Sequence, residues 1–95
     1  GGGNIIIKEI NGLEAGFSSE FPTLVIINHD RTGVIARITE IISRFKINIG
    51  NMKLDRDMHK KTGICWMELD SHVPQEVLEA IKNLQDVISV RFIDV

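Results

Sequence analysis

Apolar positions fall into short blocks separated by polar turns, and the spacing within each block predicts a strand or a helix. Thr23 to Asn28 is almost wholly apolar, which is typical of a buried strand. It ends at the polar segment 29–33, which closes with a glycine. Apolar residues then recur at i, i+4, i+7, i+8 and i+11, so an amphipathic helix over 34–45 is predicted. That stripe consists of Val34, Ile38, Ile41, Ile42 and Phe45.

The second half of the chain repeats this alternation. Segment 46–56 predicts a strand, 57–62 a hairpin loop and 64–70 a second strand that pairs with the first. Pro74 suits the first turn of a helix, where its missing N–H would be unpaired anyway. The buried face of that helix is predicted to contain Val77, Leu78, Ile81 and Leu84. A final strand over 87–93 is expected to direct Ile88, Val90 and Phe92 inward.

The element order from residue 21 is strand, helix, strand, strand, helix, strand. This order predicts an α+β, ferredoxin-like βαββαβ sandwich, in which two helices cover one face of a four-stranded antiparallel sheet. Before it, the β-branched segment 4–10, the pair Asn11-Gly12 and segment 13–17 predict a small β-hairpin after a glycine-rich start. We therefore divide the chain into a linker and N-terminal hairpin extension, 1–20, and a domain, 21–95.

Composition narrows the classes of function. A net charge of −2 and a pI near 5.9 disfavour nucleic-acid binding, which usually needs a basic face. Apolar runs stay well short of the ~18 residues that cross a bilayer, so no membrane embedding is expected. The single Cys65 and the lack of a leader-like start indicate a cytoplasmic setting. The glycine-rich start without Met is typical of a piece of a longer polypeptide.

The junction between the first strand and the first helix holds the most informative chemistry. A helix start offers free N–H groups and a positive dipole end, which suit a carboxylate. Gly33 allows close approach of a ligand, while Asn28 and Asp30 could bind an ammonium or hydroxyl group. A simpler interpretation stays open, in which Asp30 caps the helix, Asn28 ends the strand and Gly33 serves the turn.

Two stretches carry a family resemblance. Segment 23–38, TLVIINHDRTGVIARI, followed by 46–52, KINIGNM, resembles the signature of the ACT domain, with D-R-x-G-V opening the first helix and an N-I pair at the second strand. The resemblance covers 21–95. Segments 1–12 and 20–24 are similar to the end of the β subunit of bacterial iron–sulfur-dependent L-serine dehydratases. An amino-acid-binding regulatory and dimerisation module is therefore implied.

The second resemblance implies a parent enzyme that converts L-serine to pyruvate and ammonia. Its [4Fe–4S] cluster would belong to a catalytic α subunit or domain, because one cysteine cannot hold a cluster. This chain is expected to have no catalytic residue, metal or cofactor of its own. Another parent, such as phosphoglycerate dehydrogenase, remains an alternative, as does a purely structural dimerisation module.

In serine-sensing ACT domains the amino acid lies at a dimer interface, between the first loop of one copy and the start of the second strand of its neighbour. The resemblance thus implies a homodimer and a small amino acid as ligand, with L-serine as the candidate. The matching positions are Asn28, Asp30 and Asn48. The full set of candidate ligand-binding residues is Asn28, His29, Asp30, Arg31, Thr32, Gly33, Val34, Ile35, Asn48 and Ile49.

Rival interpretations fit less well. An acylphosphatase would need a glycine-rich phosphate loop around Arg31, and an RNA-recognition module would need exposed aromatics on its central strands. His29, His59 and His72 lack the spacing of a zinc site, and Cys65 is expected to be a buried hydrophobe. Trp66 falls on the sheet face without helices, so either the N-terminal hairpin or, as we favour, a second copy is expected to cover that face.

Overall fold

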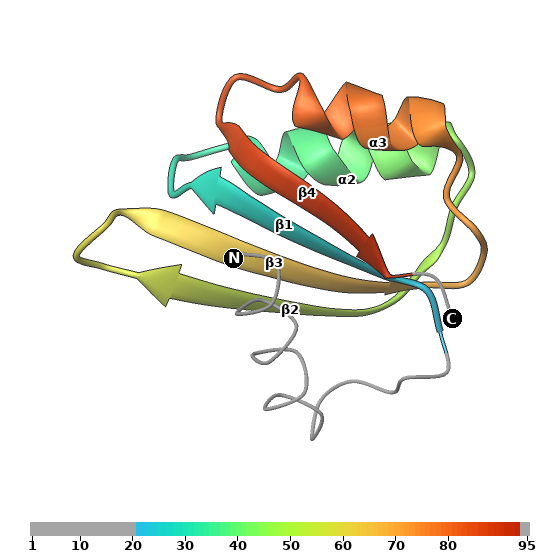
Figure 1. Cartoon of the computed structure of the whole chain (residues 1–95), viewed down its shortest axis with the longest axis horizontal. Coiled ribbons are helices and arrows are strands. Elements are labelled where there is room, and N and C mark those ends of the chain that lie inside the picture. Colours follow the sequence, from blue (N-terminus) through green and yellow to red (C-terminus); the bar gives the residue numbers. More distant parts are fainter. Residues whose placement is uncertain (1–20, 94–95) are drawn as a thin grey trace.

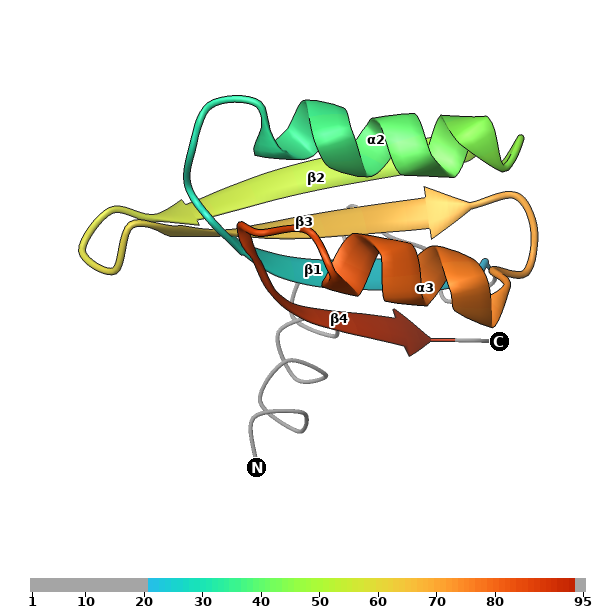
Figure 2. The same ribbon diagram turned by 90° about the horizontal axis from the view of Figure 1, so that it is seen from above.

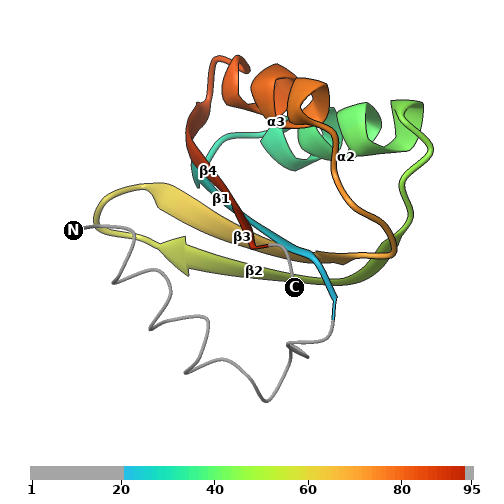
Figure 3. The same ribbon diagram turned by 45° about the vertical axis from the view of Figure 1, so that its right-hand side comes forward.

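The computed structural model describes residues 21–93, which form a two-layer α+β sandwich (Figure 1). The elements are β1 (Thr23–His29), α2 (Val34–Arg44), β2 (Ile49–Asp57), β3 (Thr62–Leu69), α3 (Gln75–Lys82) and β4 (Val87–Ile93). The strands form one antiparallel sheet in the order β2-β3-β1-β4. Both helices lie on the same face of this sheet (Figure 3). The ferredoxin-like prediction is confirmed, while the predicted N-terminal hairpin lies outside the described residues.

The core lies between this sheet face and the helices. Leu24 and Ile26 of β1 stand opposite Met67 and Cys65 of β3, and all four side chains are fully buried. The stripes of α2 and α3 complete the layer, because residues at helical spacing share one face. The buried helix residues are Val34, Ile38, Ile41, Ile42, Val77 and Ile81. Cys65 is confirmed as a core hydrophobe.

The end of α2 shifts the start of the next strand. Lys46 adopts a left-handed conformation, φ 61°. Its N–H donates to the Ser43 carbonyl, and the N–H of Ile47 donates to the Ile42 carbonyl, which together make a Schellman motif. Ile42 and Ile47 are both buried in the core. The predicted strand start at residue 46 was therefore wrong, and β2 begins only at Ile49.

A register shift corrects one further prediction. β4 pairs with β1 so that Ile27 faces Ser89, whereas the next residue, Asn28, faces Val87. The extra residue is Ile88, which was predicted to point inward but is 48% exposed. Val87 packs against the core instead. Such a bulge reverses which residues face inward, and periodicity alone does not reveal it.

Two smaller differences concern β3 and α3. β3 begins at Thr62, two residues before the predicted start, because the chain turns tightly through Met58 to Lys61. Pro74 lies at the N-cap of α3 rather than inside its first turn. On the sheet face away from the helices, Val25 and Trp66 form a second cluster and are each 1% exposed. The predicted self-association on that face stays a prediction.

This topology gathers three connections at one end of the molecule. The β1–α2 loop, the β2–β3 hairpin and the turn from α3 to β4 lie at the same end, while the α2–β2 connection lies at the other (Figure 2). β2 is an edge strand that runs parallel to β1, because both are antiparallel to β3. Because β1 and β2 run in the same direction, the end of β2 lies beside the β1–α2 loop.

Candidate functional site

The β1–α2 loop is fastened on both sides. The His29 N–H donates to the Asp86 carbonyl at 2.8 Å, and the Asp30 N–H donates to the Lys61 carbonyl at 2.9 Å. The Asp86 carboxylate, only 14% exposed, also pairs with Arg31 at 3.5 Å and with Arg37 at 3.3 Å. The loop is thus held between the turn before β4 and the β2–β3 hairpin.

Gly33 begins α2 in a conformation that suits glycine. Its φ is 88°, and a Cβ atom at this position would lie 3.0 Å from the terminal nitrogen of Arg37. Among residues 21–93 no side chain caps the helix, so the interpretation of Asp30 as a cap was wrong. The Val34 N–H at the start of α2 donates to the Arg31 carbonyl at 3.4 Å, while the positive dipole end of the helix favours an anion nearby.

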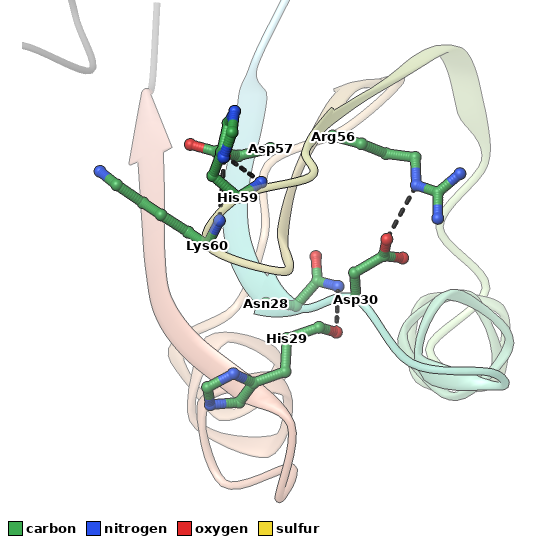
Figure 4. A network of polar contacts seen from close by, with 7 residues as sticks. All are labelled: Asn28, His29, Asp30, Arg56, Asp57, His59 and Lys60. Carbon is green, nitrogen blue, oxygen red and sulfur yellow. Dashed lines mark hydrogen bonds and ion pairs between the residues drawn. The ribbon is translucent and has the colours of Figure 1, made fainter.

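The Asp30 carboxylate turns instead toward the end of β2. Arg56 donates from Nε to Asp30 Oδ2 at 2.8 Å (Figure 4). The two residues are 26 positions apart in the sequence, and they meet because β2, at the edge of the sheet, extends as far as the loop. The Asp30 side chain is 30% exposed and that of Arg56 is 61% exposed, so solvent reaches this pair.

Beneath the ion pair lies a cavity of about 120 Å³. Asn28 at the end of β1 is 4% exposed, and its Nδ2 donates to the His29 carbonyl at 2.8 Å. Its Oδ1 has no hydrogen-bond partner among the described residues. Buried polar atoms are nearly always paired, so an unpaired one that borders a cavity marks a place for a donor. The cavity is lined by Asn28, Asp30, Ile35, Leu54, Asp55, Arg56, Gly63 and Ile64.

The predicted site residues occupy different places in the structure. Asn28, Asp30 and Ile35 line the cavity. His29, Arg31 and Gly33 shape or fasten the loop, whereas Thr32 is exposed and Val34 is buried in the core.

Asn48 and Ile49 lie at the opposite end of β2, roughly 26 Å away along the strand at ~3.3 Å per residue. There they border an open groove of about 690 Å³ together with α2. Asn48 donates from Nδ2 to the Asp70 carboxylate at 2.7 Å. One copy of the chain therefore does not bring the two ends of the predicted site together.

Five cavity residues escaped sequence reasoning: Leu54, Asp55, Arg56, Gly63 and Ile64. They belong to β2 and β3, where the pairing Arg56↔Gly63 and Asn28↔Gly63 sets three strands side by side. The only sequence signal was a glycine at the start of the second hairpin strand, which resembles an ordinary turn residue.

Cys65 and His72 occupy structural positions in the described part of the chain. Burial raises the pKa of the Cys65 thiol to about 12, which is opposite to a reactive cysteine. His72 packs edge-on against Phe92, with ring centroids 5.5 Å apart. Residues 21–93 hold no group of three side chains suited to a metal ion. In the same range, no helix combines the length and apolarity needed to span a bilayer.

Comparison with known proteins identifies the class to which this fold and loop belong. Residues 24–89 match the family described as the AHAS small subunit-like ACT domain. The chain belongs to the ACT domain family and is a regulatory, non-catalytic domain.

Among curated relatives, the chain is 30% identical over 90 residues to the probable L-serine dehydratase beta chain of Bacillus subtilis. That match covers 95% of the chain and 41% of the relative. It is also 36% identical over 91 residues to the D-3-phosphoglycerate dehydrogenase of the same organism, covering 93% of the chain and 17% of the relative. The chain therefore spans less than half the length of either relative.

Solved structures support the fold alone. The ACT domain of GTP pyrophosphokinase from Chlorobium tepidum superposes with a TM-score of 0.63 at 20% identity, covering 77% of this chain and 96% of that one. The C-terminal domain of the MgtC protein from Mycobacterium tuberculosis gives a TM-score of 0.61 at 16% identity, covering 81% and 89%.

Proposed function

We propose that this ACT domain binds a small amino acid, with L-serine as the first candidate, and regulates an L-serine dehydratase as part of a homodimer. The observation that carries the proposal is the buried, unpaired Oδ1 of Asn28 at the cavity beside the β1–α2 loop. The unpaired acceptor suits an ammonium or hydroxyl group, and the positive dipole end of α2 favours a carboxylate nearby.

The dimensions of the cavity favour a small ligand. Its volume of about 120 Å³ is small beside the ~300–1,000 Å³ of typical ligand pockets. Ile35, Leu54 and Ile64 add apolar walls to the cavity. Glycine, alanine and serine are therefore better candidates than phenylalanine or the larger branched amino acids.

A dimer would complete this site. The proposed dimer pairs the two β2 edges antiparallel, so that the start of one β2 lies beside the end of the other. The partner's Asn48 would then approach the cavity, which explains how residues at opposite ends of one chain serve one ligand. Met52 and Leu54 support this geometry, because both lie on the helix side of the edge strand and are 41% and 49% exposed.

The parent enzyme is proposed from the relatives. The L-serine dehydratase beta chains among the relatives support a lyase as the parent enzyme. We propose that its [4Fe–4S] cluster and catalytic residues lie in a separate α subunit or domain in the cytoplasm. A phosphoglycerate dehydrogenase remains the second candidate, because the chain is 36% identical to that relative and 30% identical to the L-serine dehydratase beta chain. The coding sequence on either side of this domain would distinguish the two parents.

Regulation would follow from differential binding. A ligand that bridges two copies favours the paired arrangement by the difference in its affinity for the two states. Coupling energies of this kind are typically ~1–3 kcal/mol, which corresponds to a 5–150-fold change in affinity.

Calorimetric titration of the full chain with L-serine tests the proposal, with glycine and L-phenylalanine as controls. We expect saturable binding of L-serine and no heat from L-phenylalanine, and sedimentation velocity should show that L-serine strengthens self-association. If no small amino acid binds and the dimer is unchanged, the domain is a structural dimerisation module.

The interface has its own test. Leu54→Glu introduces a charge at the proposed contact, and it should prevent dimerisation in sedimentation experiments while the monomer stays folded, because Leu54 is half exposed. Ile88→Glu is the matched control, since Ile88 is equally exposed but lies on β4, the other edge of the sheet. Dissociation by the Ile88 variant alone would place the interface at β4.

A further inference from the structure

The cavity beneath the β1–α2 loop carries two opposite charges. Asp30 and Arg56 line it together with Asn28. Their contact joins Arg56 Nε to Asp30 Oδ2 at 2.8 Å, and Figure 4 shows the pair above the Asn28 amide. Both side chains are partly exposed, so a ligand that enters from solvent meets the ion pair before it reaches Asn28.

The ion pair leaves binding capacity on both of its members. Among the described residues, the Arg56 guanidinium is engaged only through Nε and the Asp30 carboxylate only through Oδ2. A guanidinium has further N–H groups in a planar fork that matches a carboxylate, and a carboxylate has a second oxygen for an ammonium. Because an exposed ion pair contributes little to stability, its rearrangement around a ligand costs little free energy.

We infer that Arg56 and Asp30 bind the two charges of the ligand, Arg56 its carboxylate and Asp30 its ammonium, so that the site selects zwitterionic α-amino acids. Asn28 Oδ1 accepts a further hydrogen bond from the ammonium or from a side-chain hydroxyl. This inference rests on the proposed function and makes it more specific. Arg56 becomes a specificity-determining residue that lies outside the loop, and compounds that lack either charge bind more weakly.

The deciding ligand pair is L-serine and L-serinamide. The amide has nearly the same size but lacks the negative charge, and at about pH 6.5 its amine is largely protonated, below the usual pKa of ~7.7 for an α-amino group. In calorimetric titrations we expect the wild-type chain to bind L-serine roughly tenfold more tightly than L-serinamide, because the amide loses a hydrogen bond between charged groups.

Arg56→Gln should lower the affinity for L-serine about tenfold and leave the affinity for L-serinamide within twofold, so that the preference disappears. Arg56→Lys keeps the charge without the planar fork and should restore part of the preference. Arg44→Gln is the matched control, because it removes the exposed ion pair of Arg44 with Glu40, which lies outside the cavity.

A purely structural latch between loop and hairpin would behave differently. Arg56→Gln would then weaken both ligands equally, and this result overturns the inference, as does an unchanged preference for L-serine. In either case L-serine binding by the wild type keeps the proposed function intact. If the wild type binds no amino acid, the proposed function fails, and this inference fails with it.

Discussion

Replacing Asn28 by leucine is expected to stabilise the free domain while it removes the ligand site. Leucine has the same branched shape, and the Asn28 side chain is buried with Oδ1 unpaired. An unpaired buried polar atom costs about 1–3 kcal/mol, whereas the hydrogen bond from Nδ2 to the His29 carbonyl contributes about 0.5–1.5 kcal/mol. The His29 carbonyl can be hydrated after the change, because His29 is exposed.

The net effect of Asn28→Leu is therefore a gain of about 1 kcal/mol in the free energy of unfolding, which raises Tm by about 4–8 °C for a domain of this size. Asn28→Asp is the matched control. It has the same shape but replaces the donor with a second acceptor, buries charge, and should lower Tm. Thermal unfolding followed by circular dichroism, at one protein concentration throughout, measures both variants.

The same thermal unfolding assay detects ligand binding through the shift in stability. L-serine at 100 times its dissociation constant should stabilise the wild type by about 2.7 kcal/mol and the leucine variant by nothing. The reasoning is refuted if Asn28→Leu lowers the free energy of unfolding by 1 kcal/mol or more, since Oδ1 would then be satisfied in the free protein. A ligand-induced shift that survives in the variant would remove Asn28 from the site.

Three further changes test separate parts of the description. Gly33→Ala should destabilise the fold by about 1 kcal/mol or more in chemical denaturation, because φ is 88° and the new methyl group meets Arg37. Gly63→Ala should leave stability within about 0.5 kcal/mol and weaken ligand binding by filling the cavity. Equal stability of the two variants would contradict this contrast. Asp86→Asn should lower stability by about 0.5–1 kcal/mol and speed amide exchange at His29, measured by NMR; unchanged exchange would show that the ion pairs do not hold the loop. Cys65 should resist thiol reagents until the protein unfolds. Its pKa is raised from 9.0 to about 12 on folding, so its contribution to stability is complete below pH 9 and is lost as the pH rises toward 12; a pH dependence identical to that of Cys65→Ala would contradict the shift.

Local sequence patterns determined most of the elements of this domain. The stripe from Val34 defined α2, and the alternating segment 87–93 matched the bounds of β4. The loop from Asn28 to Gly33 was recognisable because its residue types combine a turn, a helix start and a family signature. These features depend on neighbouring residues, whose spacing fixes the face that each side chain shows.

Tertiary structure decided what the local patterns left open. The left-handed Lys46 delayed β2, and the bulge opposite Ile27 turned Ile88 outward. The cavity itself exists only because strand pairing carries Arg56 and Gly63 to the end of β1. Register and bulges are set by contacts between residues far apart in sequence, so spacing within one segment contains no information about them. The residue types of the loop could therefore be identified from the sequence, whereas the cavity beside the loop is formed only by the tertiary structure.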